Sequence, residues 1–210
     1  MIAVIDFGMG NLHSCLKAIS RYTSNYKLIT NPEEMSGAEG VVLPGDGAFD
    51  RAMINLQEQN FIRPLKEYLQ NGGKLFGICI GFQLLFQDSD EDLSGKGQII
   101  EGLGFVPGSI RRFRDKAFKV PHMGWNEIFL DNRKSRILKR IKNKEFMYFI
   151  HSYRAVDVED EFVAASCNYY EERFPVVVEH GNIFGTQFHP EKSDTEGLKI
   201  LENFIRLVEE

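Results

Sequence analysis

KLFGICIGFQLLF, residues 74–86, is the segment from which the architecture of this chain can be worked out. It opens on an apolar run of the kind that a buried parallel strand requires. It closes on Phe82, Leu85 and Phe86, whose spacing puts them along one face of a helix. Between these halves stands GICIG, residues 77–81, which has the form of a nucleophile elbow with sulfur in place of a hydroxyl. The segment predicts a strand, a sharp turn and a helix, with Cys79 at the turn.

Cys79 is therefore a candidate nucleophile. A sharp strand-to-helix turn strains the nucleophile's backbone and brings neighbouring chain close, so the positions two before and two after tolerate little side chain. A helix N-terminus also favours a thiolate, and its free N–H groups, that of Ile80 first, can stabilise an oxyanion. The alternative is a buried structural cysteine, which is common for a lone thiol. The paired glycines favour the nucleophile, provided that a base can be found.

Composition limits the classes of protein to consider. The chain has 210 residues, of which 43% are hydrophobic and 26% charged, as in an ordinary globular protein. Its net charge of −5 gives no reason to expect nucleic-acid or membrane binding. The three cysteines are far apart in sequence, which argues against disulfides and a zinc site and suits a reducing cytoplasm. The opening MIAVID is typical of a first strand and not of a signal peptide.

The first part of the chain alternates strands and helices. Strands are predicted over 2–6 and 27–30, from Gly40 into the turn PGDG at 44–47, and before Cys79; helices are predicted over 12–22, over 56–70 with a break near Pro64, and after Cys79. This order predicts an α/β fold with an open, mostly parallel sheet flanked by helices. Ligands of such sheets bind at the carboxyl ends of the strands, which is where the PGDG turn and Cys79 both fall.

No dinucleotide cofactor is expected. Gly8 and Gly10 follow the first strand, but His13 stands where the third glycine of a dinucleotide-binding fingerprint belongs. We expect no cofactor and no metal.

Later segments are predicted to be mostly strands. They cover 146–150, 162–167, 176–179 and 183–188, with a hairpin turn at 180–182 and a closing amphipathic helix over 195–208. A basic cluster (Arg111, Arg112, Arg114, Lys116 and Lys119) fits a solvated hairpin edge better than a nucleic-acid site, because the chain is acidic overall.

His189 is the best candidate for the base among five histidines. Pro190 keeps it extended, and in an extended chain residues i and i+2 point the same way, so Glu191 can orient the imidazole. Without Cys79 elsewhere in the chain, His189 and Glu191 could equally be a surface pair at the end of a strand. His151, after an apolar strand, is the runner-up; His180 is predicted to be exposed, and His13 lies in the first turn of a helix.

Two motifs together resemble the class I (triad) glutamine amidotransferases: GICIGFQ at 77–83 and TQFHPE at 186–191. Within that class, five segments are similar to the glutaminase subunits of imidazole glycerol phosphate synthase: GN at 10–11, LPGDG at 43–47, PHMGWN at 121–126, YFIHSY at 148–153 and FHPEKS at 188–193. The likeness covers essentially the whole chain. It implies one amidotransferase domain over 1–210, flavodoxin-like, with an additional smaller antiparallel sheet.

The resemblance implies a reaction. Cys79 would attack the side-chain amide of L-glutamine, His189 would protonate the departing ammonia, and water activated by His189 would hydrolyse the glutamyl thioester, with Glu191 holding the ring. The oxyanion hole would comprise Ile80 and the loop at Asp46 and Gly47. Substrate contacts would come from Gly47, Gln83, Glu91, Ser152 and Tyr153. A carboxylate near an oxyanion opposes it, so Asp46, where the family more often has an apolar residue, is expected to point outward.

The resemblance also implies a partner, a (β/α)8 cyclase that receives the ammonia and makes imidazole glycerol phosphate and an aminoimidazole ribonucleotide (AICAR) in histidine biosynthesis. The candidate interface residues are Asn11, Met123, Trp125, Asn126, Tyr148 and Lys192; Met123 could equally belong to the core. The alternatives are the same glutaminase with another acceptor, such as a surface-sugar precursor, a cysteine hydrolase of similar architecture, and a silent binding module, which the intact Cys79, His189 and Glu191 disfavour.

Overall fold

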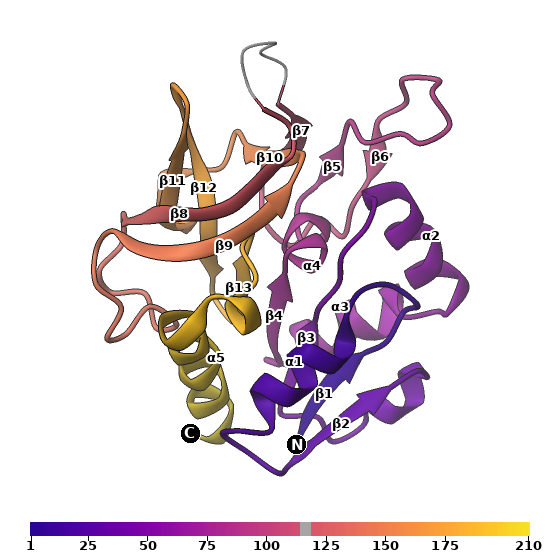
Figure 1. Ribbon diagram of the computed structural model, residues 1–210. Helices are drawn as coiled ribbons and strands as arrows, with labels where there is room; N and C mark the ends of the chain where they lie inside the picture. Colours follow the sequence, from indigo (N-terminus) through magenta and orange to yellow (C-terminus); the bar gives the residue numbers. More distant parts are fainter. Residues whose placement is uncertain (114–118) are drawn as a thin grey trace.

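The computed structural model describes residues 1–113 and 119–210, and two β-sheets form within these ranges (Figure 1). The larger sheet has nine strands in the order β2-β1-β3-β4-β13-β12-β11-β8-β9, and the smaller has four in the order β10-β7-β5-β6. The α/β class, the helix-flanked large sheet and the second, smaller sheet are as predicted, but the smaller sheet is mixed and not purely antiparallel, because β5 pairs in parallel with β7. Of the basic cluster, Arg114 and Lys116 lie outside the described residues.

The parallel half of the large sheet carries the elbow. Its strands are β1 (Ile2–Ile5), β2 (Tyr26–Ile29), β3 (Gly40–Leu43), β4 (Lys74–Ile78) and β13 (Ile183–Thr186), each parallel to its neighbours within the group. Gly77 on β4 pairs with Leu43 on one side and Gly185 on the other. Because the three strands end at the same edge, the chain segments that follow them, from residues 44, 79 and 187, meet there.

The other half of the large sheet is antiparallel. It comprises β12 (Glu172–His180), β11 (Val163–Tyr169), β8 (His122–Leu130) and the edge strand β9 (Glu145–His151). The predicted hairpin turn at 180–182 joins β12 to β13. Strand β8 was not predicted, because Gly124, Asn126 and Glu127 interrupt its apolar residues. This half extends the parallel layer instead of forming a sheet of its own.

The small sheet lies in the upper part of the molecule as it is drawn in Figure 1. Its strands are β5 (Asp88–Ser89), β6 (Ile100–Glu101), β7 (Ser109–Arg112) and β10 (Tyr153–Val156). Only Ser152 separates the end of β9 from the start of β10. The segment around Ser152 therefore ties the two sheets together.

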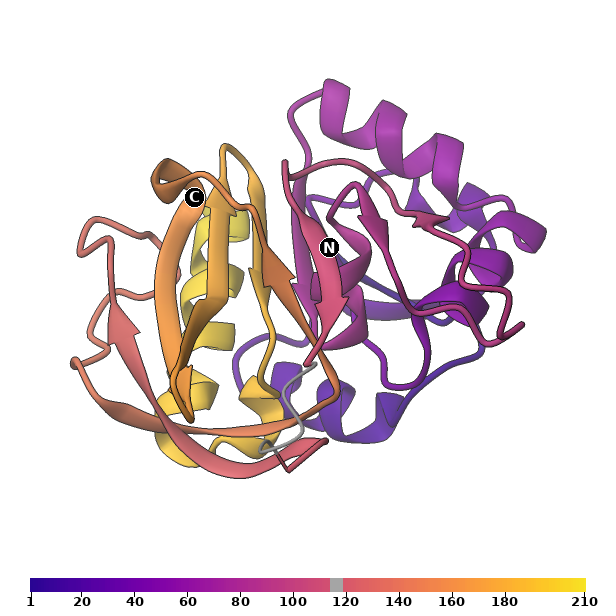
Figure 2. The ribbon, with the colours of Figure 1, turned by 90° about the horizontal axis from the view of Figure 1, so that it is seen from above.

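Helices cover both faces of the large sheet (Figure 2). Alternate residues of β1 divide between two cores: Ile2 and Val4 pack with α1 (Leu12–Ile19) and α5 (Asp194–Glu209), whereas Ala3 and Ile5 pack with α2 (Phe49–Glu58), α3 (Ile62–Gln70) and α4 (Ile80–Leu84). Over the ranges that the structure describes there are also three short 3-10 turns: η1 (Pro32–Met35), η2 (Asp160–Phe162) and η3 (Pro190–Lys192).

The helix predicted over 56–70 is in fact two helices, α2 and α3, and the first begins at Phe49. The break falls at Asn60, whose φ of 60° ends α2, and not at Pro64. Pro64 lies in the first turn of α3, where a missing N–H costs no helical hydrogen bond. Among the residues described, no helix combines the length and apolar character that a membrane span requires.

Candidate active site

The turn after β4 has the geometry of a nucleophile elbow. Cys79 has φ 54° and ψ −103°, a conformation that a residue with a side chain adopts only under constraint from its surroundings. A Cβ on Gly81 would lie 1.7 Å from the Leu43 carbonyl oxygen, and one on Gly77 would lie 2.5 Å from the Gly81 oxygen. Both glycines are therefore required by the close approach of backbone, as the pattern predicted.

Cys79 is held between three strands. Its N–H donates to the Thr186 oxygen at 2.8 Å, and its sulfur lies 4.0 Å from the Ile150 carbonyl oxygen at the end of β9. The side chain is almost completely buried. Helix α4 has only five residues, so the contribution of its dipole to a thiolate is smaller than a long helix would give.

His189 and Glu191 form a buried pair behind this turn. His189 Nδ1 lies 2.7 Å from Glu191 Oε1, and both side chains are at most 5% exposed. His189 has extended backbone, as predicted, whereas Pro190 begins the 3-10 turn η3 that brings the carboxylate back to the ring. The His189 N–H donates to the Tyr148 oxygen at 3.1 Å, which anchors this segment to β9.

Cys79 lies close enough to His189 to act on its imidazole. Burial by itself lowers the pKa of His189, but the nearby Cys79 thiol and Glu191 carboxylate more than offset this and raise that pKa to about 10. His189 Nε2 is buried and makes no hydrogen bond of ordinary geometry with the described residues. The arrangement suits an imidazolium that carries a proton beside a sulfur anion.

A hollow of about 340 Å³ opens over the sulfur. It brings together every predicted substrate-contact and oxyanion residue, although they come from four separate parts of the chain. Its lining is Asp46, Gly47, Cys79, Ile80, Gln83, Glu91, Pro121, Ile150, His151, Ser152, Tyr153 and Lys192. Asp46 is exposed at its edge, which agrees with the expected outward orientation.

Two polar side chains of this hollow are held in place by the backbone. Glu91 accepts a hydrogen bond from the Phe49 N–H at 2.8 Å, and burial raises the pKa of its carboxyl group. Gln83 donates through Nε2 to the Tyr153 oxygen at 3.1 Å and to Gln187 Oε1 at 3.0 Å. Both side chains are therefore fixed in advance of any ligand.

The predicted oxyanion hole is closed in this structure. The Ile80 N–H, which should bind the oxyanion, points instead to the Gly45 carbonyl oxygen at 3.4 Å. Residue 45 belongs to the loop that was predicted to supply the second donor. The sequence does not reveal this contact, because the direction of a peptide group in a glycine-rich loop leaves no residue pattern.

An exposed aromatic face lies on strands β8 and β9. Met123, Trp125 and Phe146 are each more than half exposed, and the Trp125 and Tyr148 rings lie 6.0 Å apart. Met123 is thus a surface residue, and Phe146 is one that the sequence analysis did not single out. The sequence alone does not tell whether an apolar residue of a half-buried strand faces the core or the solvent.

The other proposed interface residues lie elsewhere. Asn126 is on the opposite face of β8 from Trp125, and its amide donates inward to the Asn168 oxygen at 2.9 Å. Asn11 is exposed at the start of α1, where its side chain accepts from the Ser14 N–H. Lys192 lines the catalytic hollow. His180, predicted to be exposed, is half-buried against the Phe162 ring.

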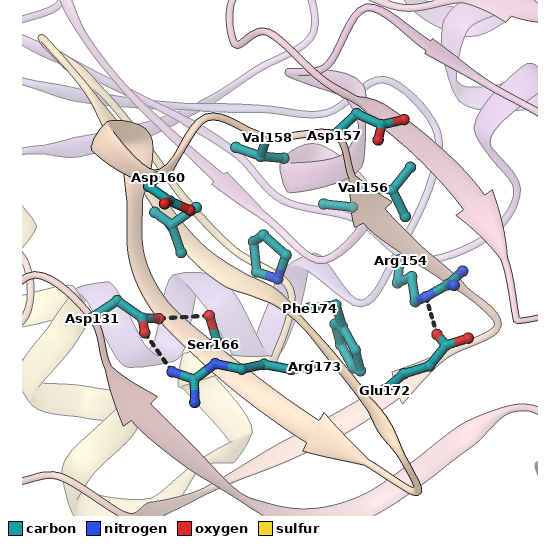
Figure 3. Close-up of a pocket in the computed structure, with 13 residues that line it drawn as sticks. Asp131, Arg154, Val156, Asp157, Val158, Asp160, Ser166, Glu172, Arg173 and Phe174 are labelled. Atoms are coloured by element: carbon teal, nitrogen blue, oxygen red, sulfur yellow. Dashed lines mark hydrogen bonds and ion pairs between the residues drawn. The ribbon is translucent and has the colours of Figure 1, made fainter.

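A larger hollow, of about 820 Å³, lies away from Cys79 against β10, β11 and β12 (Figure 3). Four of its charged side chains form two pairs: Arg173 with Asp131, which also accepts from Ser166, and Arg154 with Glu172. These four side chains are already engaged with one another, which leaves them fewer free polar atoms for a ligand. The smaller hollow is the one that contains a nucleophile.

Curated relatives match this chain along nearly its full length. It is 43% identical over 207 residues to "Imidazole glycerol phosphate synthase subunit HisH" of Moorella thermoacetica, covering 99% of this chain and 95% of the relative. It is 40% identical over 208 residues to the protein of the same name from Synechococcus sp. (strain JA-3-3Ab), covering 99% and 94%.

Solved structures share the fold. "Crystal structure of glutamine amidotransferase" superposes with a TM-score of 0.75 at 18% identity, covering 100% of this chain and 99% of that one. "Structure of PurLQS from Thermotoga maritima" superposes with a TM-score of 0.74 at 16% identity, covering 98% and 97%. The family model for "Glutamine amidotransferase class-I" matches residues 3–208. The chain therefore belongs to the class I glutamine amidotransferases and, among them, to the family of the HisH subunits.

Proposed function

We propose that this chain is the glutaminase subunit of an imidazole glycerol phosphate synthase and that Cys79, His189 and Glu191 carry out its chemistry. The observation that carries the proposal is the placement of His189, paired with Glu191 at 2.7 Å, beside a sulfur on a strained elbow. A cysteine hydrolase needs these three roles in this spatial order.

The first half-reaction releases ammonia. The Cys79 thiolate attacks the carboxamide carbon of glutamine, and the electron pair of the C=O bond moves to oxygen. When the tetrahedral intermediate collapses, the C–N bond breaks and His189 gives its proton to the departing nitrogen. Glu191 stabilises the imidazolium throughout, because a carboxylate at Nδ1 fixes both its tautomer and its charge.

The second half-reaction regenerates the enzyme. His189, now neutral, takes a proton from water, and the resulting hydroxide attacks the glutamyl thioester. The C–S bond then breaks and glutamate leaves. Glu91, which is buried at the wall of the hollow and aligned by the Phe49 N–H, is placed to accept the α-ammonium group of the substrate.

The Ile80 N–H can bind the oxyanion only after the Gly45 carbonyl oxygen has moved away from it. Rotating the peptide between Gly45 and Asp46 replaces that oxygen by the Asp46 N–H, so one movement vacates the first donor and supplies the second. Glycine at position 45 permits such a rotation. We infer that the free subunit is a poor glutaminase and that its partner promotes this rotation.

The partner in this proposal is a (β/α)8 cyclase that takes up the ammonia. The aromatic face at Met123, Trp125 and Phe146 is the best candidate for its docking surface, because interfaces concentrate their binding energy in exposed large aromatic side chains. Three buried free thiols, Cys79 among them, suit a reducing cytoplasm as the place of action.

The test is a glutaminase assay of the chain alone, with the histidine-pathway cyclase, and with the cyclase and its ribonucleotide. We expect glutamate release to rise with the partner and to fall about 10³-fold or more in Cys79→Ala. Cys167→Ala, which changes another buried cysteine, is the matched control. Glutaminase activity that appears only with a different acceptor synthase would reassign the pathway, and no activity with any partner would refute the proposal.

A further inference from the structure

Two histidines that the proposed mechanism does not use, His122 and His151, lie in the interior next to the catalytic hollow. They face each other across the β8–β9 pair, with His122 Nδ1 2.9 Å from His151 Nε2. Both are at most 6% exposed. The question is which nitrogen of each ring carries its proton.

The hydrogen bonds of the Asn126 side chain to the backbone determine the tautomer of His122. The Asn126 Oδ1 accepts from the Glu127 N–H at 2.8 Å, and its Nδ2 donates to the Asn168 oxygen at 2.9 Å. This fixes the orientation of the amide, so the group that lies 3.2 Å from His122 Nε2 is the NH2 donor. His122 Nε2 must therefore be the acceptor, and the proton of a neutral His122 sits on Nδ1.

The hydrogen bond from His122 determines the tautomer of His151. Its Nε2 accepts from His122 Nδ1, so its own proton is on Nδ1, which lies 2.7 Å from the Tyr153 carbonyl oxygen. All the hydrogen bonds run in one direction, from Asn126 to Tyr153. Both ring nitrogens of His151 are occupied, which leaves this histidine no free nitrogen with which to serve as the base for Cys79.

Both rings are neutral near pH 7. Burial lowers the pKa of His122 to about 4, and burial together with the neighbouring His122 and His189 lowers that of His151 to about 3, against the opposing effect of its hydrogen bond to Tyr153. The flat faces of His122 lie against Phe149 and Tyr169, with ring centroids 4.7 and 4.0 Å away. A second proton on His151 would set two N–H groups against each other, so the directed chain requires the neutral form.

The chain of hydrogen bonds ends in the wall of the hollow. The Tyr153 carbonyl that accepts from His151 also accepts from Gln83 at 3.1 Å, and His151, Ser152 and Tyr153 all line the cavity. Ser152 is the single residue between the two sheets; its carbonyl oxygen accepts from the Phe113 N–H at 3.2 Å, and Tyr153 pairs with Arg112 on β7. These contacts hold the wall from the side of the small sheet, and the hydrogen bonds that the Tyr153 carbonyl accepts from Gln83 and His151 hold it from the other side. The orientation of this wall therefore depends in part on what binds the Tyr153 carbonyl.

We propose that Asn126, His122 and His151 form a positioning relay that fixes the Tyr153 carbonyl and thereby holds Ser152 and Tyr153 in the geometry that binds glutamine. The inference rests on the proposed glutaminase function and assigns to these residues a role in substrate affinity, separate from bond making. It also gives Asn126, on the inward face of β8, a function other than contact with a partner.

Two substitutions at His151 distinguish this positioning role from a purely structural role and from a catalytic one. Asparagine places an amide NH2 near the position of Nδ1 and can still donate to Tyr153, whereas phenylalanine keeps the ring and removes the donor. With the partner present, we expect His151→Phe to raise the KM for glutamine about tenfold and to change kcat less than about threefold. His151→Asn should restore the KM to within about threefold of the parent chain.

His180→Phe is the matched control, because His180 also pairs with a backbone oxygen, that of Phe105 at 3.0 Å, but lies outside the hollow. It should leave the KM unchanged. If His151→Phe lowers thermal stability but leaves the KM unaltered, His151 is only structural and the proposal is wrong. A collapse of kcat in both variants at position 151 would make it a catalytic residue and would likewise overturn the proposal.

A second measurement does not depend on activity. Nitrogen NMR of the parent chain near pH 7 should show Nδ1 protonated and Nε2 unprotonated on both His122 and His151. The opposite tautomer on either ring would overturn the relay even in an active enzyme. If the parent chain shows these tautomers but no glutaminase activity with any partner, the proposed function fails while the directed chain of hydrogen bonds stands.

Discussion

Glu191 determines how His189 handles its proton. Its carboxylate lies 2.7 Å from Nδ1, and it contributes to raising the pKa of the imidazole to about 10. Glu191→Gln keeps the volume but removes the charge, and the amide can present an N–H to Nδ1 and select the wrong tautomer. We expect kcat of the complete synthase to fall about 10²- to 10⁴-fold with little change in KM.

Steady-state kinetics with glutamine measures this effect. Glu196→Gln is a suitable control, because Glu196 is a carboxylate on α5 that pairs with Lys199 away from the hollow. An unchanged kcat in Glu191→Gln would show that the carboxylate has no part in the reaction.

At this scale the sequence predicts the three triad candidates and most of the residues that line the hollow around Cys79, but not two contacts next to them. Cys79 is a candidate because glycines stand two residues before and two residues after it. Glu191 is a candidate because it stands two residues after His189, with a proline between them. The contact between the Gly45 carbonyl and the Ile80 N–H depends on the orientation of a peptide group, and the His122–His151 contact depends on the tautomers of the two rings. Both contacts join segments that are distant in sequence, and residue types alone encode neither.

Strands β8 and β9 present the aromatic face. The cross-strand pair Trp125 and Tyr148 and the nearby Phe146 are not needed to fill the core, because Trp125 and Phe146 are each 53% exposed. Trp125→Ala should therefore leave the melting temperature nearly unchanged while weakening the affinity for the cyclase at least about tenfold. Titration calorimetry with the purified partner measures the affinity, and a thermal melt checks the fold.

Ile99→Ala is the control for this surface, since Ile99 is similarly exposed in the loop before β6. The Ile99→Ala chain should bind the partner with the same affinity as the parent chain. Equal losses from both substitutions, or none from Trp125→Ala, would move the docking surface elsewhere.

Among the elements, the alternation of strands and helices up to residue 86 could be predicted because parallel strands buried on both faces are continuous apolar runs. Strand β8 could not, because Gly124, Asn126 and Glu127 interrupt its apolar residues and most of its side chains are only partly buried. The break between α2 and α3 was placed wrongly because a proline in a first turn reads like a proline that ends a helix.

The whole molecule should lose stability in mild acid because of its buried histidines. The pKa values of His122 and His151 are lowered to about 4 and about 3 in the folded chain, so between these values and about 6.5 the unfolded chain binds more protons. The free energy of unfolding should fall by on the order of 2 kcal/mol for each histidine as the pH drops from about 6.5 to 4.5.

Urea titrations across that pH range measure this dependence, and the double variant His122→Phe/His151→Phe should show a much shallower acid slope. Equal slopes in the two chains would contradict the prediction. His189 acts at the other end of the scale: its raised pKa stabilises the fold fully below about 6.5, and that contribution is lost as the pH rises through about 10.

The contact between the Gly45 oxygen and the Ile80 N–H has a consequence for the cell's use of nitrogen. A glutaminase that is always competent would drain the glutamine pool and release ammonia whenever synthesis of its acceptor fell behind. In the proposed mechanism, the Gly45 carbonyl oxygen on the Ile80 N–H keeps the free subunit idle, and turning that one peptide would couple deamination to demand.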